Sequence, residues 1–389
     1  MNIATLKTID GYLGRFLIAF FSPLTYLINL GWPLILPKGQ AGQIKKISYL
    51  KIIGGGSLLI AYPAILAVRR KYPDAKIILI CSPDVAAFAE LACIVDQFSL
   101  INTRNLWVFL RSLICALRDS WRSDIFVNYE LHSKLTTLFC FITLSERRFG
   151  LFQNWNRWQK GYINFPIFYS SSSPIYIGYE QIAFNAGGTI PSWKEACDSF
   201  QNSMGLSSST ITKLDDVIGL APFCSALYRE REFSPQQWGD VLREQVIEVD
   251  LLRVYGGSND ISRSKELCNY LSKIFPKLRI ENLTGKTSLA ELASNLLSLR
   301  KLVTIDSGII HLCRLLRVPT LSYWGPSDPY LRLRCIDSKV DVVNFKKITC
   351  SPCVHEIDIP PCKGNNICMQ QYSQEIPVCF SRAGWMLND

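Results

Sequence analysis

A short motif in the C-terminal half of the chain contains the residue types that bind phosphate. The apolar run Leu302–Ile305 ends in Asp306-Ser307-Gly308, and a helical pattern begins near Ile309, with His311 in its first turn. Backbone N–H groups at the start of a helix have no partners within it and attract anions. We predict that Asp306, Ser307, Gly308 and His311 bind a phosphate. The alternatives are a simple helix cap at Asp306-Ser307 and a buried core histidine at His311.

Two other apolar runs end in groups suited to a nucleotide. After Pro222 the loop carries Arg229 and Arg231, and arginine binds a diphosphate through paired contacts. After Tyr255 come two glycines and then Asp260, which could reach a ribose or a base. A solvated charge run and a plain turn are the alternatives.

A third kind of turn lies near the N-terminus. The apolar run Ile47–Ile53 is followed by Gly54, Gly55, Gly56 and Ser57, and then by the helical pattern Leu58–Tyr72. Many enzymes place an acid or a base at such a turn. A serine hydroxyl is a poor general base because its pKa is far above neutral.

Fourteen cysteines are present, nine of them scattered singly between Cys81 and Cys335, as expected for buried thiols in a reducing compartment. Cys350, Cys353, Cys362 and Cys368 have the spacing C-x2-C-x8-C-x5-C, with His355 between them and Cys379 beyond. Four thiols at such spacings could bind one tetrahedral zinc or iron. Disulfides and free thiols are the alternatives.

Short apolar strands alternate with helical patterns on both sides of a polar stretch, Asp198–Asp216, which we interpret as a linker. The strands expected before it are Ile47–Ile53, Lys76–Cys81, Phe98–Ile101 and Asp124–Tyr129. Those expected after it are Val217–Pro222, Leu252–Gly257, Leu302–Asp306 and Thr320–Gly325. This pattern predicts two doubly wound α/β halves that bind ligands at the carboxyl ends of their strands.

Composition restricts the partners. The chain has 389 residues, of which 48% are hydrophobic and 19% charged, with a net charge of +10. Two folded domains and anionic partners are therefore expected. The chain lacks the aromatic RNA-binding signature and the zinc-finger helix, so a nucleic acid is not expected.

The uncharged stretch Phe16–Leu36 has 21 residues, and Pro23 and Pro33 interrupt it. We expect it to lie in the plane of a membrane or to dip into it. A full span and a pair of helices packed on the protein are the alternatives.

The order of these motifs resembles glycosyltransferase family 9, the heptosyltransferase family. The similarity covers about residues 44 to 370. It is carried by the Gly-Gly turn, LTGKTSLAELASNLL (283–297), VTIDSGIIHL (303–312) and GPSDP (325–329), together with LLIAYPAILAVRRKYPDAKI (58–77).

The resemblance implies a GT-B fold: two Rossmann-like domains facing a cleft, with the acceptor bound at the N-terminal domain and the nucleotide sugar at the C-terminal one. The expected divisions are an apolar segment 1–43, an acceptor domain 44–205 and a donor domain 206–389 with a cysteine-rich tail segment 350–379. The resemblance also implies an inverting reaction that needs no cofactor. By this resemblance, Arg231 occupies the position of a phosphate-binding lysine in the family, and Asp260 that of an acidic residue that contacts the nucleotide. The family's donor-binding motif corresponds to Asp306, Ser307, Gly308 and His311. Autotransporter heptosyltransferases, which are relatives, carry iron in a similar cysteine segment.

The chain departs from the family at the opening turn, where Gly56-Ser57 replaces a usual Gly-Asp whose aspartate is thought to be the base. Glu130 follows the strand Asp124–Tyr129 and is our candidate base, with His132 second. An alternative role for Glu130 is a local ion pair with Lys134.

We therefore expect a glycosyltransferase that moves a sugar, of heptose type or another, from a nucleotide donor onto lipopolysaccharide or another surface glycan. It would be cytoplasmic and peripheral on the inner face of the membrane. The alternatives are an inactive nucleotide-sugar-binding or assembly protein and a protein O-glycosyltransferase. The sequence leaves the donor, the acceptor and the oligomeric state open.

Overall fold

The computed structural model describes residues 3–35, 43–205, 214–225, 228–354, 356–357 and 360–372. The chain divides into two compact units, residues 1–192 and 193–389. We call them unit 1 and unit 2 and describe each by itself.

Unit 1 is built on a six-stranded, all-parallel sheet in the order β3-β2-β1-β4-β5-β6. Its central strands are buried, as expected for a parallel sheet covered on both faces. The strands are β1 (Lys46–Lys51), β2 (Lys76–Cys81), β3 (Gln97–Leu100), β4 (Ile125–Asn128), β5 (Arg147–Phe152) and β6 (Phe165–Phe168).

Helices cover both faces of this sheet. On one face α2 (Gly55–Lys71) packs against α3 (Pro83–Ala92) and α6 (Ile175–Asn185). On the other, α4 (Leu106–Ser120) and α5 (Lys134–Ile142) bury Phe109, Leu113 and Phe139 against the strands.

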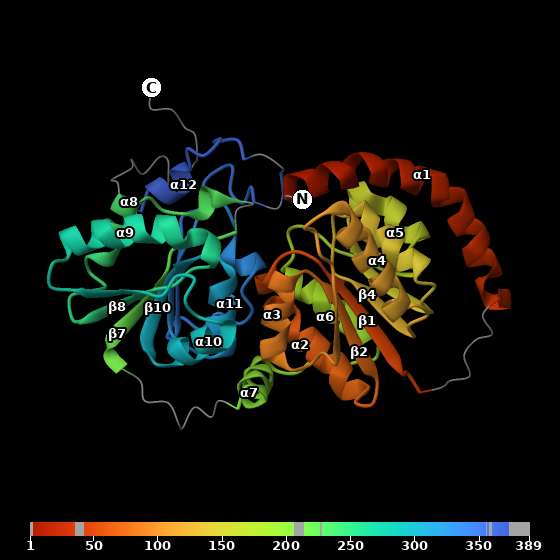
Figure 1. Ribbon diagram of the computed structural model, residues 1–389, viewed down its shortest axis with the longest axis horizontal. Helices are drawn as coiled ribbons and strands as arrows, with labels where there is room; N and C mark the ends of the chain where they lie inside the picture. Colours follow the sequence, from red (N-terminus) through yellow and green to blue (C-terminus); the bar gives the residue numbers. More distant parts are fainter. Residues whose placement is uncertain are drawn as a thin grey trace. The chain divides into compact units, whose positions relative to one another are not determined.

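The first helix, α1 (Ile3–Ile35), runs over α5 (Figure 1). Ile18 is buried with Leu138, Phe141 and Tyr162, and the Tyr162 hydroxyl donates to the Ile18 carbonyl at 2.6 Å. Part of the stretch Phe16–Leu36 therefore forms one helix that packs on the protein and continues through Pro23. No helix among the described residues is both long and apolar enough to cross a bilayer.

Asp10 on α1 fixes that helix to the start of α5. Its carboxylate accepts hydrogen bonds from the Ser133 hydroxyl (2.7 Å) and from the backbone N–H groups of Lys134 (3.1 Å) and Leu135 (2.8 Å). A carboxylate at a helix N-terminus satisfies orphan donors and complements the helix dipole. The α1 helix is thus joined to the segment that follows β4.

Unit 2 repeats the same topology. Its all-parallel sheet has the order β12-β11-β10-β7-β8-β9, in which the fourth strand of the unit again pairs with the first. The strands are β7 (Leu214–Ala221), β8 (Leu251–Val254), β9 (Arg279–Asn282), β10 (Leu299–Ile305), β11 (Thr320–Trp324) and β12 (Asp341–Phe345).

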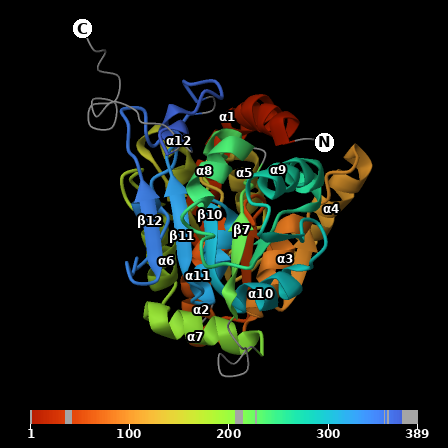
Figure 2. The ribbon, with the colours of Figure 1, turned by 90° about the vertical axis from the view of Figure 1, so that its left-hand side faces the viewer.

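Two groups of helices enclose this sheet (Figure 2). On one face Trp238 of α8 (Pro235–Leu242), Leu271 of α9 (Ile261–Ile274) and Met369 of α12 (Ile367–Gln370) share one core with the strands. On the other face α11 (Gly308–Leu315) packs against α7 and α10. The bounds of these two helices are Trp193–Ser203 (α7) and Leu289–Leu297 (α10).

The doubly wound α/β architecture predicted from the sequence is confirmed, and each expected strand lies within a few residues of an observed one. The predicted linker Asp198–Asp216 begins inside α7, and its residues 206–213 lie outside the described part of the chain. The strands β5, β6, β9 and β12 were not predicted.

Candidate functional site

The predicted phosphate-binding motif of unit 2, which we call the donor motif, lies where the strand order reverses. The loop after β7 and the turn after β10 are neighbours at this point, because those two strands pair. Ligands of open α/β sheets bind at such switch points, outside the carboxyl ends of the strands. The loop carries Arg231, in the short 3-10 helix η2 (Arg229–Arg231), and the turn carries Asp306 and Ser307.

Arg231 and Asp306 form a buried ion pair across this point. The guanidinium Nη1 lies 3.1 Å from Asp306 Oδ2, while Nη2 donates to Ser225 Oγ (3.2 Å) and Nε to the Tyr228 carbonyl (3.1 Å). Only 8% of Arg231 is exposed. Burial acts to raise the pKa of Asp306, but Arg231 above all, with Ser327 and His311, lowers it to about 2. The pair is therefore charged at neutral pH.

Ser307 offers a hydroxyl and a helix end to an anion. It is the N-cap of α11, yet its side chain makes no capping bond. Its hydroxyl is buried and has no hydrogen-bond partner among the described residues. A buried polar group without a partner is costly unless a ligand or a water satisfies it. Together with the N–H groups that open α11, this hydroxyl can bind a phosphate oxygen.

His311 lies in the first turn of α11 and is buried. Burial, aided by the positive charges of Arg314, Arg332 and Arg231, lowers the pKa of its imidazole to about 4, although Asp306 acts in the opposite direction. The ring is therefore neutral at pH 7. Sequence reasoning missed Arg332, whose charge acts on both Asp306 and His311. Arg332 follows the 3-10 helix η4 (Pro329–Leu331). Its effect on the pKa of Asp306 and His311 arises because the fold brings it near them.

Asp260 is part of a separate charge network. Its carboxylate accepts from the Gly257 N–H at 3.0 Å and pairs with Arg263, which also pairs with Glu232. Arg263 lies over the Phe223 ring, 4.7 Å from its centroid. The network fixes the loop after β7 to the start of α9, and the predicted nucleotide contact of Asp260 stays a prediction.

The cysteine segment packs against the turn after β11. A side-chain carbon added at Gly325 would meet Met369 Sδ at 2.8 Å and Cys368 Sγ at 3.0 Å, and the Cys353 N–H donates to the Pro326 carbonyl at 2.9 Å. Burial raises the pKa of the Cys368 thiol to about 12, and the thiols of Cys353, Cys350 and Cys362 act in the same direction.

No group of three or more His, Cys, Asp or Glu side chains that could hold a metal ion is found in the described part of the chain. The structure therefore does not show the predicted four-cysteine metal site. His355 and Cys379 lie outside the described residues.

In unit 1 the corresponding switch point lies between β1 and β4. Gly54, the N-cap of α2, has a φ of 88°, and a side-chain carbon at Gly55 would overlap the Phe88 ring, so this turn requires glycines. Ser57 lies in the first turn of α2 and is partly exposed.

Glu130 lies against this same turn. Its Oε1 accepts from the backbone N–H groups of Ile52 (2.8 Å) and Ile53 (3.0 Å) and pairs with Lys51 Nζ at 3.3 Å. The alternative local pair with Lys134 is wrong, because Glu130 pairs with a lysine 79 positions away along the chain. The structure thus places Glu130 beside the turn that carries Ser57.

His132 follows Glu130 by two residues in the loop after β4. Its ring stacks on Trp155, with centroids 5.5 Å apart and planes 5° apart. Trp155 belongs to the 3-10 helix η1 (Asn154–Gly161), which follows β5. Sequence reasoning did not find Trp155.

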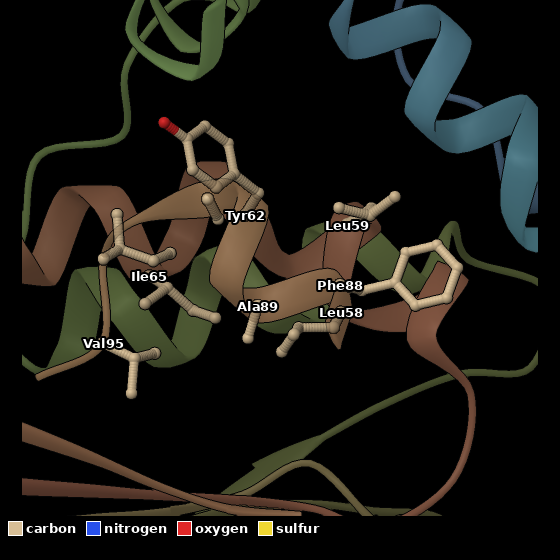
Figure 3. Close-up of a pocket in the computed structure, with 9 residues that line it drawn as sticks. Leu58, Leu59, Tyr62, Ile65, Phe88, Ala89 and Val95 are labelled. Atoms are coloured by element: carbon tan, nitrogen blue, oxygen red, sulfur yellow. The ribbon is translucent and has the colours of Figure 1, made fainter. Parts of the chain in front are cut away.

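A small apolar hollow in unit 1 is separate from these residues. It lies between α2 and α3, lined by Leu58, Tyr62, Ile65 and Phe88 among others (Figure 3). Its volume of about 10 Å³ holds no more than one water molecule, and its lining is apolar. It therefore cannot hold a sugar.

Comparison with known proteins agrees with this geometry. Residues 203–363 match the model of glycosyltransferase family 9 (heptosyltransferase). The chain carries a glycosyltransferase family 9 domain. The match includes Arg231, Asp260, Asp306 and His311 and ends before Cys368.

Solved structures extend the likeness to both units. Heptosyltransferase WaaC of E. coli with ADP-2-deoxy-2-fluoro heptose is 14% identical, with a TM-score of 0.58, covering 84% of this chain and 98% of that one. ADP-heptose LPS heptosyltransferase II of E. coli is 17% identical (TM-score 0.55; 85% and 100% covered). A family 9 glycosyltransferase of Veillonella parvula is 16% identical (TM-score 0.56; 81% and 90% covered). A search of curated protein sequences gave no match.

The predicted family and GT-B fold are confirmed, and the family 9 domain is that of a glycosyltransferase. At identities this low, the solved structures support the fold, whereas the roles of single residues rest on their geometry. Glu130, Ser57, His132 and the donor residues of unit 2 stay predictions as functional residues.

Because His311 is buried and neutral, the free energy of unfolding should depend on pH. Unfolded histidine takes up a proton near pH 6.5, whereas folded His311 does so only near pH 4, so stability is lost as the pH falls through this interval. Wild-type protein should lose about 2 kcal/mol from this residue between pH 7 and pH 5, and His311→Gln should be spared that loss. Asp306 titrates lower and does not contribute in this interval.

Chemical denaturation of both proteins at pH 7 and pH 5 measures the difference. An equal loss of unfolding free energy in wild type and His311→Gln would show that the histidine is not held neutral.

Proposed function

We propose that the chain transfers a sugar from a nucleoside diphosphate to a hydroxyl group of a surface glycan or glycolipid, with inversion at the anomeric carbon. The observation that carries this proposal is the donor motif of unit 2: a charged Arg231–Asp306 pair beside the hydroxyl of Ser307 at the start of α11, which has no hydrogen-bond partner in the described part of the chain. ADP-heptose is the first donor to test, because the E. coli structures similar to this chain are heptosyltransferases, one of them solved with an ADP-heptose analogue.

The diphosphate is both the group to be bound and the leaving group. As the bond between the anomeric carbon and the phosphate oxygen breaks, negative charge grows on the diphosphate. Ser307, the N–H groups that open α11, and the positive charges of Arg231 and Arg332 offset it. Asp306 balances part of that positive charge and holds Arg231 in place. His311 is neutral and can donate or accept a hydrogen bond there without adding charge.

In unit 1, Glu130 is the proposed base. The acceptor oxygen forms its bond to the anomeric carbon as its proton passes to the Glu130 carboxylate. Ser57 in the same turn can bind an acceptor hydroxyl but does not take the proton. His132 is the second candidate base.

Glu130→Gln separates catalysis from structure. The glutamine oxygen can still accept from the Ile52 and Ile53 N–H groups, so the turn should persist, whereas the base is lost. We expect turnover to fall by about 10² to 10⁴ while donor affinity changes little.

Glu130→Ala is the matched control, because it also removes the acceptor for both N–H groups and should lower the melting temperature. Wild-type turnover in Glu130→Gln would disprove Glu130 as the base.

The rival proposal is a binding protein on the same fold, favoured by one observation: serine stands where an aspartate base is usual in the family. Slow release of nucleotide from a bound donor would exclude it. A third proposal, transfer to a protein, predicts that radioactive donor labels protein.

We also propose that α1 holds the enzyme at a membrane surface, where glycolipid acceptors lie. Tyr12, Phe16, Phe20 and Leu24 form an outward stripe at intervals of four residues, and each is exposed. Aromatic and apolar side chains on one helix face bind the headgroup region, and the net charge of +10 favours anionic lipids.

Co-sedimentation with vesicles of neutral and anionic phospholipid tests this proposal. Replacing both Phe16 and Phe20 by serine should weaken binding at least about tenfold. Phe184→Ser on α6, where the ring is 72% exposed, is the control and should leave binding unchanged. Equal binding of both variants would place the membrane contact elsewhere.

A structural iron or zinc at Cys350, Cys353, Cys362 and Cys368 stays a prediction, because the described residues do not gather the thiols into a metal-binding group. Metal analysis of anaerobically purified protein should find about one atom per chain, lost in Cys353→Ser. Protein without bound metal would contradict it.

A further inference from the structure

Trp155 is an exposed aromatic side chain that the proposed chemistry does not use. Trp155 is 57% exposed, although it lies just beyond β5, a strand whose side chains are largely buried. It lies at the carboxyl edge of the unit 1 sheet, because it follows β5, which neighbours β4. The loop with Glu130 and His132 follows β4 at the same edge.

The ring of Trp155 is held firmly. Its indole N–H donates to the buried Gln153 Oε1 at 2.8 Å, so the one polar atom of the ring is satisfied. The side-chain amides of Asn156 (3.1 Å) and Gln159 (3.0 Å) both donate to the Leu131 carbonyl. These bonds tie η1 to the β4 loop.

The far side of η1 is fixed as well. Trp158 packs against the buried cluster that joins Ile18 of α1 to Leu138 and Phe141 of α5. The η1 segment is therefore clamped between α1 and the β4 loop, and the packing of Trp158 leaves Trp155 to face outward.

His132 extends this surface. Its ring is nearly parallel to the indole, with an angle of 5° between the two planes, so the two rings stack. A stacked partner restricts the rotation of the exposed ring. A rigid aromatic surface binds at a lower cost in side-chain entropy than a mobile one.

Such a surface suits one class of ligand. One face of a pyranose ring presents C–H groups, and the hydroxyls project from the rim. The C–H groups carry partial positive charge and are attracted to the negative face of an aromatic ring. The rim hydroxyls need nearby polar groups, and Glu130, Asn154 and Arg157 lie in the same two loops. Binding sites of this kind combine an aromatic surface with a few polar groups.

We propose that the stacked rings of Trp155 and His132 form a platform that binds a sugar ring of the acceptor. Trp155 follows β5, whereas Glu130 and His132 follow the neighbouring strand β4, so a sugar on the platform would lie at the same edge of the sheet as the proposed base. Only the assignment of this sugar to the acceptor rests on the proposed function; the binding of a sugar ring does not.

Saturation-transfer NMR on the full chain, without donor, tests the platform directly. The probes are the methyl glycosides of glucose, galactose and mannose at millimolar concentration. Ring C–H protons of at least one probe should receive saturation from wild-type protein. Trp155→Ala should reduce this signal at least about fivefold. Trp155→Phe, which keeps an aromatic face, should retain most of it.

Trp121→Ala is the matched control. Trp121 is 41% exposed but precedes β4, so it lies at the opposite edge of the sheet and should not matter. His132→Ala is a second variant, which keeps Trp155 and should weaken the signal by removing its stacking partner. If no probe contacts the wild type, or if the signal survives in Trp155→Ala, the platform is wrong. Because no donor is present, this result is independent of whether the chain transfers a sugar.

Discussion

Both units depend on one constraint of their parallel sheets: strand order reverses between the first and the fourth strand. The connections that leave these two strands run to opposite faces, so a gap opens at their carboxyl ends. In each unit a largely buried carboxylate bridges the gap. Glu130, after β4, binds the backbone that follows β1, and Asp306, after β10, binds Arg231, which follows β7.

The two bridges have different consequences. In unit 1 the carboxylate holds main-chain N–H groups and so shapes the glycine turn that ends in Ser57. In unit 2 it holds a guanidinium, and removing one partner of such a buried pair costs about 3–5 kcal/mol because a charge is left uncompensated. The Arg231–Asp306 pair therefore keeps a cation beside the start of α11, where the hydroxyl of Ser307 is available. The contact between Arg231 and Asp306 therefore both joins the two loops of the donor motif and sets its charge.

The sequence was most informative where chemistry follows an apolar run. Asp306, Arg231, Ser57 and Glu130 were singled out because each follows a buried strand, and the structure places them at the switch points of the two sheets. Their functional roles stay predictions. The strand β6 was missed because Pro166 interrupts it, which an edge strand tolerates. The strand β5 was missed because it begins with two charged residues, Arg147 and Arg148, although most of the strand is buried.

Partners distant along the chain could not be predicted. Glu130 pairs with Lys51 rather than with the nearby Lys134. Two N–H groups at the start of α5 donate to Asp10, which lies more than a hundred residues earlier. Trp155 and Arg332 belong to no sequence motif that we recognised. Trp155 stacks on His132, and Arg332 acts on Asp306, and both neighbours are known only from the folded structure. The apolar N-terminal segment was recognised, but its packing on α5 depends on residues of both helices.

The measurement that tests the central claim most directly is a thermal-shift and nucleotide-release screen of the full chain against ADP-, UDP-, GDP- and dTDP-sugars. A ligand that binds only the folded state raises the melting temperature in proportion to the logarithm of its concentration above Kd. Our account predicts that at least one of these donors stabilises the protein and slowly releases its nucleotide. Stabilisation without release, even with membrane extract as the source of acceptor, would contradict catalysis and favour a binding protein, and the absence of any stabilisation would contradict the donor site itself.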